Sequence, residues 1–406
     1  MSTPSLEAEK RGFKAPGTGF MVAGALIGAV GAYLFQVYGG RSLGPEDFAP
    51  VSVLWTTFFI LATVLLVPVE QYVTREAASG RRALPHDLMP TFVMAVIGAV
   101  IGGVFVFLTL DDLFEGSYQY VLQIVLLMVG YSLLFVAKGL LAGTRHFGQV
   151  GWALVVETSA RLAGGLIAIQ LFATATSLGW AMVIGGFAVL GMGWWRYDIG
   201  ESKERSAPAR GFLTGYVGGT SSSQLLLGGA PIAVAALGAS PALISIVFVT
   251  FTLFRAPLTL IFALQGRILP YLVGLARDAN HTQLARIARL VVFGGAVVAL
   301  FGGLVGWLVG ADVVSLLFGP EFAPSSTVAM LAAAGVMAAA AAQVGSQVLV
   351  AEARTRRLTV AWVGGLAAAV LALFLLSGEP DTLVAMSFAI GEFVALGLMA
   401  VLATRR

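Results

Sequence analysis

The chain has 406 residues, of which 58% are hydrophobic and only 11% are charged, and its net charge of +3 is small. Ordinary globular chains carry about 25% charged residues, so this composition indicates an integral membrane protein and no nucleic-acid partner. The sequence contains no cysteine, which excludes disulfides, thiolate metal sites and cysteine nucleophiles. Its three histidines, His86, His146 and His281, fall in predicted loops, so no histidine metal cluster is expected inside the membrane.

Long apolar segments recur along the whole chain. About 20 consecutive apolar residues span a bilayer core as a helix. The fold class predicted is therefore all-α, with about twelve transmembrane helices. The expected spans are 17–39, 49–74, 88–110, 118–142, 148–172, 174–195, 213–237, 242–266, 284–309, 324–350, 358–377 and 381–403.

Basic residues alternate between the loops and predict the orientation. All but four of the 24 lysines and arginines lie in the N-terminal segment or in loops on the same side; the exceptions are Arg41, Lys138, Arg161 and Arg255. Short cytoplasmic loops carry an excess of Lys and Arg. We therefore expect a multi-pass protein of the plasma membrane with both termini in the cytoplasm.

The longest loop divides the predicted spans into two sets of six. It is charged, contains Ser-Ala-Pro-Ala, and separates an N-terminal bundle, 1–197, from a C-terminal bundle, 212–406, through a cytoplasmic linker, 198–211. A faint internal repeat supports two pseudo-symmetric six-helix bundles. It aligns Leu43-Gly44 with Leu237-Gly238, Thr56 with Thr250, and Gln71 with Gln265.

Three short loop motifs resemble those of a known transporter group. They are Leu43-Gly-Pro-Glu-Asp-Phe48, Gly139-Leu-Leu-Ala-Gly-Thr-Arg-His-Phe147 and Leu317-Phe-Gly-Pro-Glu-Phe322. In motif and position they resemble the polysaccharide (lipid-linked oligosaccharide) flippase branch of the multidrug/oligosaccharidyl-lipid/polysaccharide exporter superfamily. Two departures are Ala49, where family members often have Gly, and Leu-Gly-Gly-Ala-Pro231, where many carry an Asp.

The resemblance implies two six-helix bundles around a central cavity that opens alternately to either side of the membrane. In the polysaccharide branch, such a cavity moves an undecaprenyl-diphosphate-linked sugar. In the drug-exporter branch, the same fold runs cation antiport, and the missing Asp in segment seven counts against cation coupling through that helix.

Arg255 is expected near the middle of the eighth span, on one helix face with Thr252 and Thr259. Inserting a charged residue at the centre of the bilayer costs about 2.5–3.5 kcal/mol of free energy, so we expect such a residue to have a structural or functional role. One interpretation is a cavity cation for a diphosphate or anionic sugar, because guanidinium binds phosphate bidentately. The alternative is an ion pair with Glu392 or a bond to the carbonyls of a kinked backbone before Pro257.

Glu157 and Arg161 lie four residues apart in the fifth span, in the favourable order for a helix salt bridge. Self-neutralisation would explain both without any ligand. In the other interpretation, substrate phosphate competes for Arg161 and leaves Glu157 to take a proton. Glu392, in the last span, has three open interpretations: a protonation site, a partner of Arg255, or a protonated glutamate bonded to a neighbour.

A candidate gate or cavity entrance lies at the cytoplasmic helix ends. Lys138 either snorkels to the interface or meets a lipid headgroup there. Glu70, Gln71 and, in the repeat, Gln265 either cap helix ends or form an inner gate.

Further polar residues complete the candidate cavity lining. Thr56, Thr63 and Glu70 recur every seven residues and predict one polar stripe along the second span. Gln224, Gln343 and Gln347 are candidate sugar contacts, or equally helix–helix contacts. Gly24, Gly28 and Gly31 predict close packing of the first span.

The leading hypothesis is a flippase for a lipid-linked oligosaccharide, working by alternating access and not an enzyme. A cation-coupled multidrug or metabolite antiporter is the alternative. A third is a non-transporting membrane scaffold of a glycan-synthesis complex. The expected partners are the lipid-linked glycan, membrane lipids, and a glycan polymerase or glycosyltransferase. No cofactor or metal site is expected, and H⁺ or Na⁺ coupling stays open.

Overall fold

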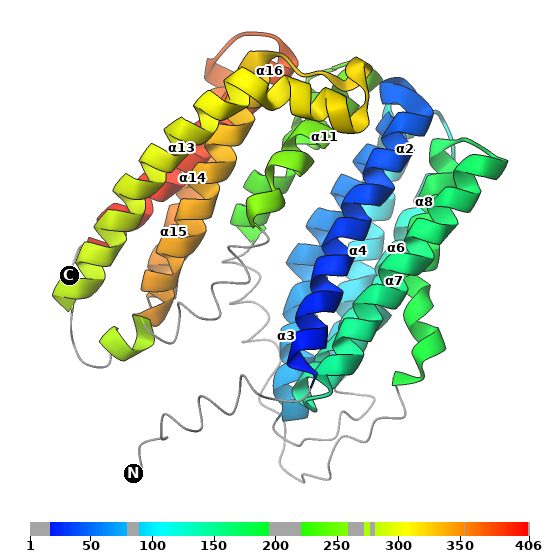
Figure 1. Ribbon diagram of the computed structural model, residues 1–406, viewed down its shortest axis with the longest axis horizontal. Coiled ribbons are helices and arrows are strands. Elements are labelled where there is room, and N and C mark those ends of the chain that lie inside the picture. The colour runs from blue at the N-terminus through cyan, green and yellow to red at the C-terminus, as the bar shows by residue number, and fades with distance from the viewer. Residues whose placement is uncertain are drawn as a thin grey trace. The chain divides into compact units, whose positions relative to one another are not determined.

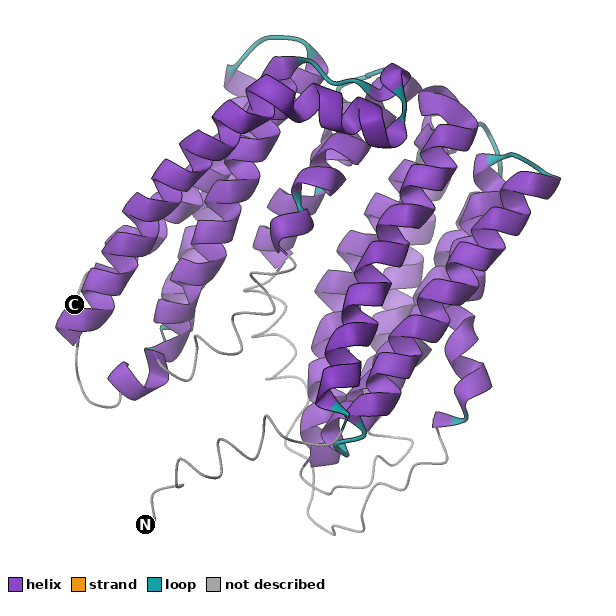
Figure 2. Cartoon of the chain, in the orientation of Figure 1, coloured by secondary structure: helices purple, strands orange, loops and turns teal. Residues whose placement is uncertain are grey.

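The computed structural model describes residues 17–78, 89–194, 221–258, 272–276, 281–352 and 354–404. Within these ranges the chain is helical with short connections and no strand (Figure 2). Ten helical stretches there are long and apolar enough to cross a membrane. The chain is therefore an all-α, multi-pass membrane protein, as predicted.

The exact number of twelve spans stays a prediction. The first stretch, Thr18–Ala78, covers two predicted spans in 61 residues. At about 1.5 Å per residue it is long enough for two crossings of a core of about 30 Å. The seventh predicted span is described only from 221, where residues 221–228 are helical and a break at Gly229 precedes α10 (Ala230–Ala236).

Contacts divide the chain into two compact units. Figure 1 labels the main helices of the chain. The first unit contains the described residues within 1–43 and 57–217, and the second contains those within 44–56 and 218–406. The segment Gly44–Thr56 thus packs with the second unit, although the sequence placed it inside the N-terminal bundle. The predicted linker, 198–211, lies outside the described residues, and the two-bundle division and its central cavity stay predictions.

In the first unit, α6 packs against α3, α4 and α8, and α7 packs against α8. The helices of this unit, beyond the first part of α2 (Thr18–Leu61), are the π-helical turn η1 (Ala62–Leu66), α3 (Val67–Ala78), α4 (Met89–Leu108), α5 (Leu110–Leu113), α6 (Gln119–Gly143), α7 (Phe147–Leu171), α8 (Ala175–Phe187) and the 3₁₀ turn η2 (Ala188–Met192).

In the second unit, α14 packs against α13 and α16, and α15 packs against α16. Its further elements are α11 (Pro241–Phe254), α13 (His281–Phe318), the 3₁₀ turn η4 (Pro320–Phe322), α14 (Ser326–Ala351), α15 (Thr355–Leu375) and α16 (Pro380–Thr404). Residues 272–276 are also helical.

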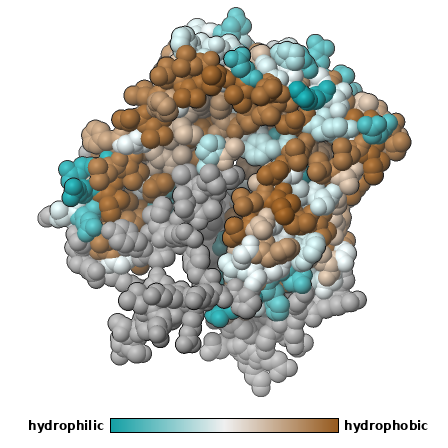
Figure 3. All heavy atoms as spheres, viewed as in Figure 1, coloured by the Kyte–Doolittle hydropathy of each residue, from teal (hydrophilic) through white to brown (hydrophobic). Residues whose placement is uncertain are grey.

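The outward side chains of these helices are strongly apolar, as membrane lipid requires. Hydrophobic residues cover much of the visible described surface in Figure 3. On α13 the large exposed side chains include Leu290, Phe293, Val297, Leu300, Phe301 and Leu304.

The expected turn at Arg41–Asp47 is reduced to a single residue. Helical hydrogen bonding runs through α2, and only Gly44 leaves the helical conformation, with φ 79° and ψ 169°. Pro45 explains part of this, because proline disfavours the helical conformation in the residue before it. Gly238, aligned with Gly44 in the predicted repeat, also has a positive φ of 76°.

Close packing at the glycines of the first span is present as predicted. A Cβ atom on Gly24 would lie 2.5 Å from the Gly151 carbonyl oxygen, and one on Gly31 would overlap Thr158. These contacts bring the first part of α2 against α7.

We expect Gly24→Ala to lower stability by about 1–3 kcal/mol, the usual cost of overpacking, because backbone atoms of α7 cannot move aside as a side chain can. Gly19→Ala is the matched control, since no atom lies within 4 Å of its Cβ position. Thermal unfolding of the purified variants measures both. An equal loss of stability at the two positions would contradict the packing described.

Candidate functional site

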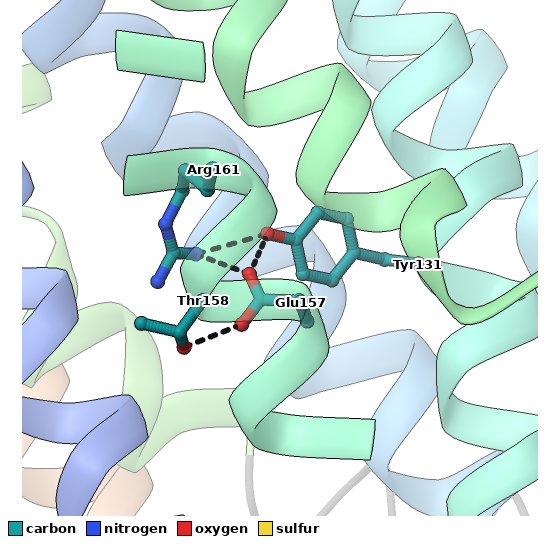
Figure 4. A network of polar contacts seen from close by, with 4 residues as sticks. All are labelled: Tyr131, Glu157, Thr158 and Arg161. Atoms are coloured by element: carbon teal, nitrogen blue, oxygen red, sulfur yellow. Dashed lines mark hydrogen bonds and ion pairs between the residues drawn. The ribbon is translucent and has the colours of Figure 1, made fainter. Parts of the chain in front are cut away.

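A buried polar network joins α6 and α7 in the first unit (Figure 4). The Arg161 Nη1 atom lies 2.5 Å from Glu157 Oε1, and Tyr131 donates its hydroxyl proton to the same oxygen at 2.5 Å. Arg161 Nη1 also donates to the Tyr131 hydroxyl at 3.0 Å, and Thr158 donates to Glu157 Oε2 at 2.9 Å. Glu157 and Arg161 are 5% and 6% exposed. The carboxylate thus receives three donors in a site closed to water.

Two glycines of α8 allow this network to form. A Cβ atom on Gly185 would lie 2.8 Å from the Arg161 Cβ atom, and one on Gly186 would lie 2.7 Å from the Tyr131 ring. The guanidinium also lies 5.9 Å from the centre of the Phe35 ring. Close helix approach therefore holds the pair in one arrangement and seals it.

The network favours the structural interpretation of the Glu157–Arg161 pair. The guanidinium that would hold a diphosphate is occupied by Glu157 and Tyr131. Sequence reasoning missed Tyr131 and Thr158. Tyr131 lies 26 residues away on another helix, and its only signal is that a buried tyrosine hydroxyl usually requires a partner.

The second unit contains a buried carboxyl group of a different kind. Glu392, on α16, is 0% exposed, and neither carboxylate oxygen has a hydrogen-bond partner among the described residues. Its electrostatic partner is Arg255. Gly391 and Gly365 bring α16 against α15 beside it, since a Cβ on Gly391 would lie 2.9 Å from the Gly365 oxygen. Such burial without hydrogen bonds is costly, so this group requires a reason beyond packing.

Arg255 lies at an irregular turn of the span, between helical residues 241–254 and 256–258. Helix α11 ends at Phe254, and Arg255 follows as its C-terminal cap with φ −77° and ψ −10°. Its N–H is shared between the Phe251 and Thr252 oxygens, both at 3.2 Å. Pro257 explains the irregular turn at Arg255, because proline has no N–H to continue the helix and its ring clashes with the preceding turn. The expected span 242–266 is confirmed as far as Leu258, with the irregular turn before Pro257, and its remaining residues lie outside the described ones.

The other polar candidates of the second unit lie in varied surroundings. Thr252 and Gln224 are partly exposed, and Gln343 is buried. On α14, Ser346 donates to the Gln343 carbonyl oxygen at 2.7 Å, and Gln347 donates to Ser346 at 3.3 Å. Thr259 and Gln265 lie outside the described residues.

The predicted stripe Thr56–Thr63–Glu70 is not continuous. Thr56 packs with the second unit, whereas Thr63 and Glu70 pack with the first. The π-helical turn η1 also intervenes, and its i to i+5 hydrogen bonds add a residue to the turn and rotate the helix beyond it. Thr63 donates to its own helix, at the Phe59 oxygen, at 2.7 Å.

Lys138 and Glu70 form an ion pair between α6 and α3. The Nζ–Oε2 distance is 2.8 Å, and the side chains are 17% and 18% exposed. Lys138 also lies 4.6 Å from the centre of the Phe135 ring. Two candidate gate residues are thus brought together, while Gln71 is exposed.

We expect Lys138→Met to change stability by less than about 1 kcal/mol, since ion pairs that solvent or lipid headgroups can reach contribute little. The charge-exchanged double variant Lys138→Glu with Glu70→Lys is the control for the pair. Thermal unfolding measures both variants. A loss of several kcal/mol in the single variant, recovered by the exchange, would contradict a weak pair.

No group of three or more His, Asp or Glu residues that could hold a metal ion occurs within the described ranges.

Comparison with known proteins gives the fold but no named family. No protein-family profile matches the sequence. The chain is 28% identical to the uncharacterized protein Rv3630 of Mycobacterium tuberculosis, over 92% of this chain and 89% of that protein. It is 29% identical to the uncharacterized protein Mb3654 of Mycobacterium bovis, over 92% and 88% of the two chains.

Solved transporter structures share the fold. An inward-facing multidrug resistance MATE family transporter of the MOP superfamily matches with a TM-score of 0.68 and 14% identity, over 91% of this chain and 93% of that one. The MATE transporter VcmN of Vibrio cholerae matches with a TM-score of 0.61 and 14% identity, over 96% of both chains. A MOP superfamily transporter from Pyrococcus furiosus matches with a TM-score of 0.61 and 15% identity, over 95% and 93%.

These likenesses define the fold. The chain has the fold of MATE family transporters of the MOP superfamily, and its structural neighbours are membrane transporters rather than enzymes. The shared fold does not determine the substrate, so the assignment to a polysaccharide flippase depends on the residues of the site.

Proposed function

We propose that this protein is a flippase that moves a polyprenyl-diphosphate-linked oligosaccharide, such as an undecaprenyl-linked one, across the plasma membrane by alternating access. The observation that carries the proposal is Arg255, a cation at an irregular turn within a candidate membrane span, two residues before Pro257. Discontinuous helices form the substrate sites of many transporters, near mid-membrane. A guanidinium there suits a diphosphate, which it can bind through two parallel hydrogen bonds.

Charge distinguishes this proposal from drug export. For the transporter from Pyrococcus furiosus, reverse polarity of the binding pocket suggests a different function. We apply the same reasoning to Arg255, because a fixed cation favours an anionic ligand and disfavours a cationic drug. The polar side chains of Gln224, Gln343 and Gln347 are candidate contacts for the sugar.

Glu392 supports a second candidate, cation-coupled antiport of a drug or metabolite. A fully buried carboxyl group with no hydrogen-bond partner among the described residues suits a proton carrier. Both activities would use the same fold, and a proton taken up at Glu392 could also drive lipid flipping. A non-transporting scaffold for a polymerase or glycosyltransferase is the third candidate, and it requires no ligand at Arg255.

Reconstitution tests the proposal. The purified protein in liposomes should speed the appearance of a polyprenyl-diphosphate sugar in the opposite leaflet, measured by attack of a membrane-impermeant glycan-cleaving enzyme. Empty liposomes give the background rate. Equal rates with and without protein would overturn the flippase, whereas proton-linked uptake of a cationic drug by the same liposomes would support the antiporter.

A further inference from the structure

A repeated four-residue pattern forms the middle of α4. The sequence reads Ala95-Val-Ile-Gly98 and then Ala99-Val-Ile-Gly102, and Gly103-Val104 continues it with glycine in place of alanine. Residues four apart lie on nearly the same face of a helix, one above the other. The small residue, the valine, the isoleucine and the glycine of the pattern therefore each form a stripe along α4.

The glycine stripe packs on α6, and the isoleucine stripe is exposed. A Cβ atom on Gly98 would overlap Met128, and one on Gly102 would lie 2.7 Å from the Ile124 Cγ1 atom. The residue number rises along α4 while it falls along α6, so the two helices are antiparallel. The small-residue stripe and the valine stripe lie beside this contact.

These two stripes form one wall of a groove, and α6 supplies the other wall. The volume of the groove is 580 Å³, within the range of about 300–1,000 Å³ that is usual for ligand sites. Ala95 lies on the floor, at 6% exposure, and Gly103 is also buried. Val100 stands at the rim, at 58% exposure, and Val129 of α6 is exposed on the opposite side. The groove is therefore deep over the small residues and bordered by valines.

The groove follows the direction of α4 and has a defined length. At about 1.5 Å per residue, its α4 wall from Phe92 to Val104 is about 18 Å long. A bilayer core is about 30 Å thick, so the groove extends over more than half of it. One end is marked by Phe107, whose ring centre lies 6.4 Å from that of Tyr118, the residue before α6.

The chemistry of the groove suits an apolar occupant. Among the described residues that line it, Ser132 alone has a polar side chain, and its hydroxyl donates to the Val129 oxygen of its own helix at 2.7 Å. None of these described lining residues carries a charge for a diphosphate or a cationic drug. Both helices are long and apolar enough to cross a membrane. The molecules that can reach the groove are therefore lipids and other membrane helices.

The shape of the groove favours a lipid chain over another helix. Two membrane helices approach closely where small residues lie at their contact surface. Here the small residues form the floor, and valines, whose side chains are stiff at χ1, stand above them at the rim. The valines hold a second backbone away from the floor, whereas a hydrocarbon chain is thin enough to enter.

We propose that the α4–α6 groove binds one acyl chain of a bilayer phospholipid, along the floor formed by Ala95, Ala99 and Gly103. The occupant is a phospholipid rather than a polyprenyl carrier, because no described lining residue is a cation that would select a diphosphate. The chain exchanges one apolar environment for another, so its binding depends on the number of close contacts. The groove therefore selects the chain and not the head group. This inference is independent of the transported substrate.

Native mass spectrometry of the purified protein tests the groove by counting the phospholipids that stay bound. Ala99→Phe would fill the floor, and we expect it to lower phospholipid retention by about tenfold, since the loss of about ten atom contacts is enough for that change. Val93→Phe is the matched control, because Val93 is exposed on the same helix and does not line the groove. It should retain as much phospholipid as the unsubstituted chain. Equal retention in the two variants would overturn the proposal.

Gly103→Leu keeps the test available if Ala99→Phe does not fold. A Cβ atom at this position would make an ordinary contact, 3.7 Å from the Val125 Cγ2 atom, and leucine is a better helix former than glycine. The longer side chain would occupy the groove, so phospholipid retention should fall here as well. Retention equal to that of the unsubstituted chain would overturn the proposal.

Lipid exchange tests what the groove recognises. Delipidated protein should retain phosphatidylglycerol and phosphatidylethanolamine equally when their acyl chains are the same, and should retain less of either lipid when its chains are much shorter. Retention that follows the head group would overturn the proposal. So would a polyprenyl lipid, or a second copy of the chain, that is bound to the unsubstituted protein and lost in Ala99→Phe.

Discussion

Replacing Arg161 by methionine should destabilise the protein by about 3–5 kcal/mol, because Glu157 would then remain buried without its cation. The three donors that surround Glu157 include Arg161 at 2.5 Å, and no water-accessible position is available to the carboxylate at 5% exposure. Arg289→Met is the matched control. Arg289 is exposed, and its Nε atom donates to Ala285 of its own helix, so its loss should change stability by no more than about 0.5 kcal/mol.

The double variant Glu157→Gln with Arg161→Met should recover most of that loss, because it removes both buried charges together. Buried ion pairs can often be replaced by neutral groups without a net cost. Thermal unfolding and transport are measured on the same preparations. If stability returns but transport does not, Arg161 or Glu157 has a role in substrate or proton movement, and the structural interpretation of the network fails.

Arg255→Ala should weaken binding of a polyprenyl-diphosphate sugar by about 10- to 100-fold, the loss expected for hydrogen bonds of about 1.5–3 kcal/mol to a charged group. Arg255→Lys should retain only part of the binding affinity that Arg255→Ala loses, because an ammonium group cannot reproduce the bidentate contact. Equilibrium binding of the fluorescent lipid-linked sugar to protein in nanodiscs measures both variants. Arg289→Ala is the control for the general effect of positive charge.

The interaction with Glu392 requires a further comparison. Removing Arg255 alone leaves the buried Glu392 without its electrostatic partner, so part of any loss could reflect folding. The double variant Arg255→Ala with Glu392→Gln removes both charges and should restore stability but not binding. Restored binding in the double variant would show that Arg255 acts only as a partner of Glu392.

Helices and membrane crossing could be predicted from the sequence because they depend on long apolar runs. Close packing of the first span was also predictable from its spaced glycines, and Gly24 and Gly31 make it, but the glycines did not indicate α7 as the partner. These features are local, and each depends on residues within one segment.

Contacts between different segments were harder to predict from the sequence. Glu157 and Arg161 share a helix turn and could be paired, but Tyr131 joins them from another helix. The same holds for Lys138 with Glu70, which lie 68 residues apart. No periodicity within a span indicates which face of a second span it will meet.

Irregular backbone accounts for the other features that could not be predicted from the sequence. The predicted stripe Thr56–Thr63–Glu70 assumed a regular helix, and the π-helical turn Ala62–Leu66 has no sequence signature that would have shown the shift. At Arg255 a signal was present, because Pro257 lies two residues later and predicts a kinked backbone before it. Irregular backbone at these points is expected where a transporter builds its site or bends.

The ligand that stays with the purified protein tests the central claim most directly. Native mass spectrometry of the protein, released gently from its own membrane, should show a bound lipid whose mass fits a polyprenyl diphosphate carrying sugars. That adduct should decrease in Arg255→Ala and persist in Arg289→Ala. A protein that carries no such lipid, and instead retains an added cationic drug, would contradict the flippase and favour the antiporter.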